Sequence, residues 1–150
     1  MHPFQKKLTL GLNHVQVLVR GMFAVARCDG VHATELVLLR EFYEGCRADV
    51  DGLASFEDVI SVELDADSAR DVLDTDELRE LFLRSCLLLA FADGVFSPAE
   101  RQLLVELATL LGVTPERRAE LEDEARSYLL QRIAHIHNVD ALQDVVKELA

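Results

Sequence analysis

Four acidic side chains stand at matching places around two Asp-Gly turns, and they are the residues best suited to chemistry. Asp29 and Asp93 each follow an apolar stretch and precede a glycine, while Glu35 and Glu100 open the stretch that comes next. Carboxylate oxygens are the ligands that hard divalent cations such as calcium and magnesium prefer. A metal site built from these four residues is therefore one hypothesis for this chain.

The same residues also have a purely structural interpretation. An aspartate before a glycine forms an Asx-turn, and the glycine then supplies the left-handed residue that ends a helix. Glu100 stands three residues after Ser97, with Pro98 between them, which is the spacing of a helix capping box. An acidic group at the C-terminal end of a helix opposes the helix dipole, so it needs a cation, an arginine or backbone N–H groups nearby. The sequence leaves metal binding and structural capping open.

Other sites with a known spacing are excluded. An EF-hand loop aligned on Asp93 would place Leu89 and Phe91 at its first and third positions, where neither side chain carries an oxygen. His135 and His137 are two residues apart, so they lie on different faces of a helix and cannot form an i,i+4 zinc pair. The sequence has no glycine-rich phosphate loop, nucleophile elbow or CxxC pair. We therefore expect no enzymatic activity.

The two Asp-Gly turns belong to an internal repeat. The residues from Met22 to Val31 match those from Cys86 to Val95, which lie 64 residues later, and an amphipathic stretch follows each copy. Two helical hairpins can bury their apolar faces against each other around a pseudo-twofold axis, which one pair of helices cannot do. We expect such a duplicated helix-DG-helix hairpin to supply the core. The spacing from aspartate to glutamate is one residue shorter in the first copy, which puts the equivalence of the two acidic pairs in question.

Helical periodicity dominates the chain. Apolar residues recur at spacings of three and four, glycine and proline are few, and no long stretch alternates like a β-strand. We expect one or two short helices within 48–75 and longer ones at about 13–28, 33–47, 75–92, 98–111, 117–130 and 139–149. This pattern predicts an all-α fold, a single multihelical domain of seven or eight helices over residues 1–150, with the first 12 or so as a flexible arm.

Capping residues set several of the expected boundaries. Asp74, with Glu77 three residues later, is expected to cap the helix that begins near residue 75. Ser97 is expected to cap the helix that follows it, and Gly112 to end that helix. Thr114 and the proline after it repeat the start signal for the next helix.

The second copy resembles the tellurite-resistance TerB-like family. The hallmark of that family is an apolar helix that ends in Ala-Asp-Gly, followed by a short turn, Ser-Pro-x-Glu and another amphipathic helix. Residues 92–100 of this chain fit it closely, since they read Ala-Asp-Gly-Val-Phe-Ser-Pro-Ala-Glu. The first copy departs from this pattern, because Cys28 replaces the alanine. The resemblance covers about 12–130 and implies a bacterial, cytoplasmic, all-helical domain linked to tellurite and other stress responses. It also implies acidic residues proposed to bind metal and use as an interaction module, with no established reaction.

Negative charge is concentrated in one part of the chain. Residues 48–80, called the acidic segment below, hold 12 Asp or Glu against Arg70 and Arg79, while the formal net charge of the whole chain is −12. Such a segment repels phosphate backbones and anionic lipids, so we expect neither a nucleic acid nor a membrane surface as partner. A basic protein partner is one interpretation, and a solvated face that keeps the protein soluble is the other. The sequence also leaves a homo-oligomer open.

The cysteines and the apolar runs indicate a cytoplasmic protein. Cys28, Cys46 and Cys86 are odd in number and lie in helical patterns, which suits reduced thiols packed in a core. No signal peptide is evident, and the apolar runs are too short to cross a bilayer. The sequence thus predicts a non-catalytic, cytoplasmic TerB-like domain that binds a divalent ion or, alternatively, serves as a metal-free adaptor through its acidic segment.

Overall fold

Helices make up most of the chain that the computed structural model describes, which is residues 10–28, 30, 33–91 and 96–128, and these ranges contain no strand. A further helical stretch covers 115–128. The all-α prediction is confirmed, whereas the arm and the helix predicted at 139–149 fall largely or wholly outside the described residues. The named helices are α1 (Leu12–Arg27), α2 (Ala33–Asp49), α3 (Phe56–Ile60), α4 (Ala66–Val72), α5 (Asp76–Phe91) and α6 (Pro98–Leu110).

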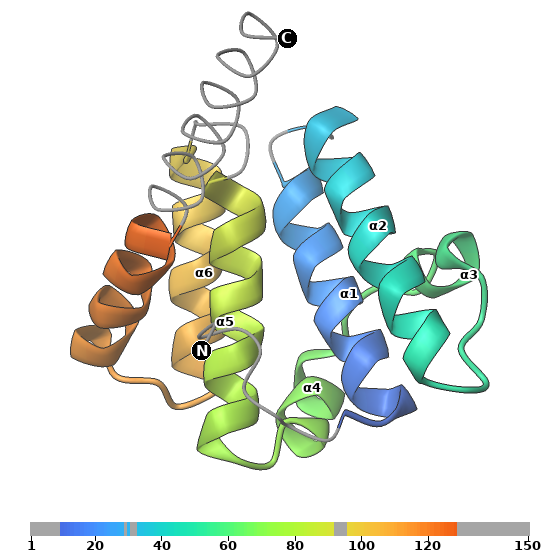
Figure 1. Ribbon diagram of the computed structural model, residues 1–150. Coiled ribbons are helices and arrows are strands. Elements are labelled where there is room, and N and C mark those ends of the chain that lie inside the picture. The colour runs from blue at the N-terminus through green and yellow to red at the C-terminus, as the bar shows by residue number, and fades with distance from the viewer. Residues whose placement is uncertain (1–9, 29, 31–32, 92–95, 129–150) are drawn as a thin grey trace, which may run out of the picture.

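Helices α1 and α5 lie side by side at the centre of the fold (Figure 1). Helix α2 packs against α1, α6 packs against α5, and the short helices α3 and α4 contact α1. The C-terminal ends of α1 and α5 and the N-terminal ends of α2 and α6 all lie at the same end of the molecule, at the top of Figure 1. Two helical hairpins therefore pack against each other, and their relation by a twofold axis stays a prediction.

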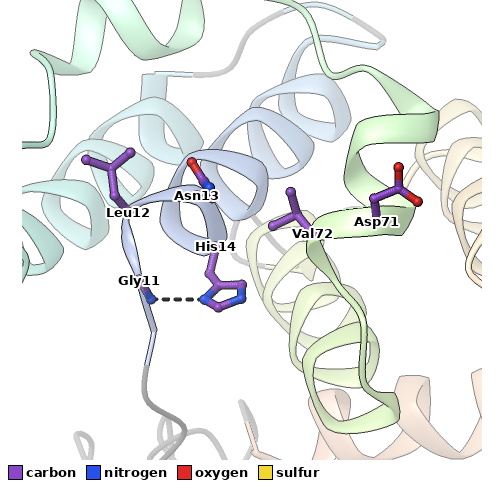
Figure 2. A pocket seen from close by; sticks show the side chains of 6 residues that line it. All are labelled: Gly11, Leu12, Asn13, His14, Asp71 and Val72. Carbon is purple, nitrogen blue, oxygen red and sulfur yellow. Dashed lines mark hydrogen bonds between the residues drawn. The ribbon is translucent and has the colours of Figure 1, made fainter.

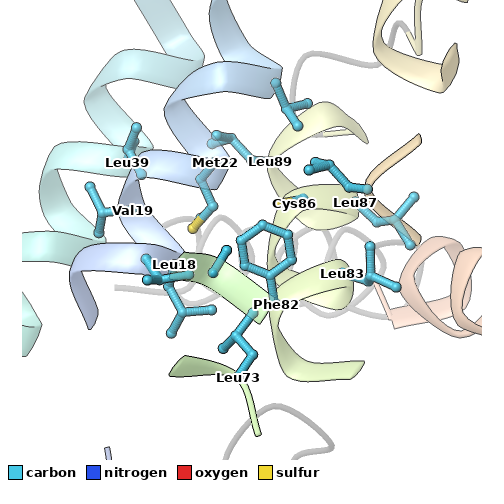
Figure 3. Close-up of a cluster of buried hydrophobic side chains, with 14 of the residues drawn as sticks. Leu18, Val19, Met22, Leu39, Leu73, Phe82, Leu83, Cys86, Leu87 and Leu89 are labelled. Atoms are coloured by element: carbon cyan, nitrogen blue, oxygen red, sulfur yellow. The ribbon is translucent and has the colours of Figure 1, made fainter. Parts of the chain in front are cut away.

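The core lies between α1 and α5. Along α1, Val15, Leu18, Met22 and Val25 are buried at spacings of three and four, the period of a helix with one apolar face. Figure 3 shows Met22 and Leu18 facing Phe82 on α5. Complete burial of a large apolar side chain contributes about 1.5–3 kcal/mol, so the packing of α1 against α5 stabilises the fold substantially. Other buried members of the core include Val19, Leu39, Tyr43, Leu73, Leu83, Cys86, Leu87, Leu89, Leu104 and Leu111.

Local capping sets the helix ends, largely as the sequence predicts. The capping box at the start of α6 is present, and Gly112 takes a φ of +76° just after α6 ends. The predicted cap of α5 is wrong by one residue: the hydroxyl of Thr75, not the carboxylate of Asp74, accepts a hydrogen bond from the backbone amide of Leu78, at 3.2 Å. Both residue types cap helices well, so propensity could not choose between neighbours.

The helical stretch 115–128 is attached to α5 by charged side chains as well as by the buried Leu121 and Ala125. Arg117 donates to both carboxylate oxygens of Glu80, at 2.7 and 3.1 Å. Arg84 donates to Glu124 at 3.1 Å. These pairs cross between segments distant in sequence, so they fix how this stretch docks on the hairpin. No helix of the described ranges is both long and apolar enough to cross a membrane.

Candidate functional site

Glu35 and Glu100 occupy the same place in their helices. Each is the third residue of its helix, counted from Ala33 in α2 and from Pro98 in α6. Their exposed fractions are 0% for Glu35 and 1% for Glu100. The spacing from aspartate to glutamate is one residue shorter in the first copy, and this difference falls before the helix begins. The two glutamates are therefore equivalent with respect to the helix start.

Glu100 takes part in a reciprocal capping interaction. Its Oε1 accepts a hydrogen bond from the backbone amide of Ser97 at 3.0 Å, and the Ser97 hydroxyl accepts one from the Glu100 amide at 3.1 Å. The structural role expected of the Ser-Pro-x-Glu motif is thus real. This interaction uses Oε1 of the carboxylate and fixes the Glu100 side chain against the start of α6.

Complete burial makes both glutamates electrostatically unusual. An ionised carboxylate removed from water is costly unless hydrogen bonds or opposite charge compensate for it. Both side chains lie in the first turn of a helix, where the positive end of the helix dipole favours an anion. At both helix starts, therefore, a carboxyl group is shielded from solvent next to the positive end of a helix dipole.

The aspartates of the candidate set, Asp29 and Asp93, lie outside the described residues. Helices α1 and α5 end just before them, so both helices bring the chain to the end of the molecule where α2 and α6 begin (Figure 1). In the part of the chain that the structure describes, no group of three His, Cys, Asp or Glu side chains is placed to hold a metal ion. The structure therefore gives positions for two of the four proposed ligands, Glu35 and Glu100.

The acidic segment forms an exposed surface over α3, α4 and the start of α5. Eleven of its twelve carboxylate side chains are exposed, and Glu80 is half-buried. Arg40 donates to Glu57 at 2.6 Å, and this hydrogen bond holds the pKa of the Glu57 carboxyl below its ordinary range. Arg27 pairs with Glu63 at 3.2 Å. The segment keeps a strong negative charge that faces solvent.

A shallow cleft lies where the start of α1 approaches the end of α4 (Figure 2). The backbone amide of Gly11 donates to Nδ1 of His14 at 2.9 Å, which leaves Nε2 as the protonated nitrogen of a neutral ring. Sequence reasoning did not select His14, because the cleft depends on contact between segments nearly 60 residues apart. The cleft has a volume of about 490 Å³ and is lined by Gly11, Leu12, Asn13, His14, Asp71 and Val72.

The three cysteines differ in their surroundings. Cys86 is buried, and its burial raises the pKa of the thiol far above the usual range, so it stays protonated and packs as an apolar group. Burial and the nearby Asp49 carboxylate raise the pKa of Cys46, which is half-buried. Cys28 is exposed, so the expectation that all three pack in the core is wrong for this residue. Cys28 follows the last residue of α1, where the apolar stripe has ended.

Comparison with known proteins gives one family. A family model described as "Tellurite resistance protein TerB" matches residues 38–123, which is more than half of the chain. The match begins inside α2 and ends inside the stretch 115–128, so it includes Glu100 and leaves Glu35 just outside. Neither the curated proteins nor the solved structures that were compared gave a match. The family match agrees with the motif at residues 92–100, and the chain belongs to the tellurite resistance protein TerB family.

Proposed function

We propose that this TerB-family domain binds a divalent cation through acidic residues at the ends of its two hairpins and acts without catalysing a reaction. The proposed ligands are Asp29, Glu35, Asp93 and Glu100. The observation that carries the proposal is the matched placement of Glu35 and Glu100, each completely buried in the first turn of its helix. We place this activity in a cytoplasmic, bacterial stress response associated with tellurite.

A bound cation would place positive charge beside two completely buried carboxylates. Hard divalent ions accept carboxylate oxygens at flexible geometry, and calcium tolerates incomplete protein ligand sets with water in the remaining positions. The capping interaction of Glu100 with Ser97 would orient one oxygen and leave the carboxylate in a fixed position. Binding of this kind is weak and reversible, which suits a sensor or a regulated interaction module.

Thermal melting with and without metal tests this proposal. Calcium, magnesium, manganese and zinc are titrated against the wild type and Asp93→Asn, with a chelator as reference. A free metal concentration of about 100 times Kd should stabilise the wild type by about 2.7 kcal/mol, and Asp93→Asn should lose most of this stabilisation. The matched control is Asp51→Asn, because Asp51, like Asp93, precedes a glycine in the sequence; Asp51 lies in an exposed turn in which Gly52 has a φ of +86°. Identical melting with every ion and with chelator would refute metal binding.

A second candidate function uses the acidic segment as a docking surface for a basic protein. The observation in its favour is that eleven of twelve carboxylates there are exposed. Binding of a fluorescent lysine-rich peptide should weaken as salt rises, because exposed charges are screened within about 10 Å at 0.1 M salt. Binding that is unchanged when four exposed acids become amides would exclude this function. The four substitutions are Asp58→Asn, Asp67→Asn, Asp71→Asn and Glu77→Gln.

A further inference from the structure

A cluster of aromatic and charged side chains surrounds the start of α6. The rings of Phe91 and Phe96 meet edge to face, with centroids 4.9 Å apart and an interplanar angle of 81°. The guanidinium of Arg101 lies over the Phe96 ring at 4.6 Å, and that of Arg126 lies over the Phe91 ring at 5.2 Å. Both arrangements are favourable, since the ring edge is positive and the ring face is negative.

Glu122, on the stretch 115–128, links the two arginines. Arg101 donates to both of its oxygens, at 2.9 and 3.2 Å, and Arg126 donates to it at 3.4 Å. The Glu122 side chain is only 15% exposed, so water screens these bonds less than it screens most surface pairs. One carboxylate thus holds two guanidinium groups against two rings.

This cluster adjoins the capping box that contains Glu100. Phe96 is the residue before the N-cap Ser97, and Arg101 is the fourth residue of α6. In a hydrophobic staple, the residue before the N-cap contacts the fourth helical residue and fixes the angle at which the chain enters the helix. Here a ring and a guanidinium make that contact. The staple therefore fixes the Ser97 amide, which donates to Oε1 of Glu100.

The first hairpin has no matching arginine. The fourth residue of α2 is Leu36, which is half-buried, so a guanidinium cannot form the staple there. Arg27 does stack on Phe23, at 5.5 Å, but both residues belong to α1, and Glu63, which pairs with Arg27, is exposed. The two glutamates are equivalent in position but differ in the side chains that support them.

We infer that Phe96, Arg101 and Glu122 are positioning residues for Glu100. The inference rests on the proposed metal function, in which Glu100 is a ligand. Because Glu122 belongs to the stretch 115–128, the same contacts tie the position of Glu100 to the docking of that stretch. Release of the stretch from α5 and α6 would loosen the Glu100 carboxylate.

Hydrogen exchange of the Ser97 and Glu100 amides, together with the carboxyl ¹³C signal of Glu100, tests the positioning. In Phe96→Leu these two amides should exchange about threefold to fivefold faster, the effect expected for loss of one cation–π contact, and the Glu100 signal should shift. Phe96→Tyr keeps the ring and should restore wild-type behaviour. Glu122→Gln should act like Phe96→Leu, while Glu116→Gln, an exposed residue of the same stretch, should act like the wild type.

Unchanged exchange at Ser97 and Glu100 in Phe96→Leu would overturn the inference, as would an equal acceleration at amides throughout α1. Manganese titration of the same proteins separates this inference from the proposed function. If the wild type binds manganese, Phe96→Leu should bind about threefold to fivefold more weakly, and an unchanged affinity would refute positioning. If the wild type binds no metal, the proposed function fails, and the amide exchange still decides whether Glu100 is positioned.

Discussion

The ring of Phe82 on α5 lies directly against the backbone of Gly21 on α1. A Cβ atom placed on Gly21 would overlap both Cε2 and Cζ of the ring. Both residues are buried, and the contact lies on the face along which the two central helices pack. The absence of a side chain at Gly21 is what lets α1 and α5 approach each other at this point.

Gly21→Ala should therefore destabilise the protein by about 1–3 kcal/mol, because overpacking forces the ring or the helices to move. The matched control is Gly45→Ala in α2, where a Cβ meets nothing within 4 Å. That change should be neutral or stabilise by up to about 1 kcal/mol, since alanine favours a helix. Chemical unfolding measures both. Equal stability of the two variants would show that the close approach of α1 and α5 is absent.

The pairing of Arg117 with Glu80 should contribute measurably to the docking of the stretch 115–128. The pair is bidentate, and the hydrogen bonds from Arg117 to Glu80 raise the pKa of the guanidinium, so it stays charged at every working pH. Because the pair is partly exposed to water, Arg117→Ala should cost only about 1 kcal/mol at low salt, and less in 1 M salt. Arg47→Ala, which removes an exposed i,i+3 pair with Glu44, should change the free energy of unfolding by much less. A loss that salt does not reduce would contradict the ionic origin.

The Glu57 carboxyl should titrate below the ordinary range for a glutamate, because Arg40 donates a hydrogen bond to its charged form. When folding lowers a pKa, the folded protein gains stability at pH values above the pKa of the unfolded state. This stability is lost as the pH falls through the pKa of the folded state. The pair is exposed, so added salt should weaken the effect. NMR titration of the wild type and Arg40→Gln measures it. Identical Glu57 titration curves in the two proteins would contradict the assignment.

The cysteines should react with a thiol reagent in the order of their exposure. Cys28 is exposed and should react fastest, and Cys46 is half-buried and should react more slowly. Cys86 is buried with a raised thiol pKa, so it should react only when the protein unfolds. The rates can be followed with a chromogenic disulfide and assigned with single Cys→Ser variants. Rapid reaction of Cys86 under native conditions would contradict the core packing around α5.

The sequence predicts the helices well because their signals are local. The apolar stripe of α1 and the Ser97–Glu100 capping box involve residues three or four apart, so a short contiguous segment of the sequence contains each whole pattern. The family motif at 92–100 is likewise contiguous. The errors are local too: Thr75 replaces Asp74 as the cap of α5, and Cys28 lies beyond the end of the buried stripe.

The features that the sequence could not supply depend on contacts between distant segments. The approach of Gly21 to Phe82 spans some 60 residues, and a glycine inside a helix gives no sign of its partner. The link from Arg101 to Glu122 depends on how the stretch 115–128 docks. Glu35 is a candidate from spacing alone, but its complete burial follows only from packing.

Paramagnetic broadening by manganese shows which carboxyl groups lie next to a bound metal ion. Manganese is added in small amounts to protein labelled with ¹³C at its carboxyl groups, and all Asp and Glu signals are followed together. The signals of Glu35 and Glu100 should broaden first, and Glu35→Gln and Glu100→Gln should each weaken the broadening at the other glutamate. Broadening that begins among the exposed carboxylates of the acidic segment, with Glu35 and Glu100 still sharp, would contradict the proposed site.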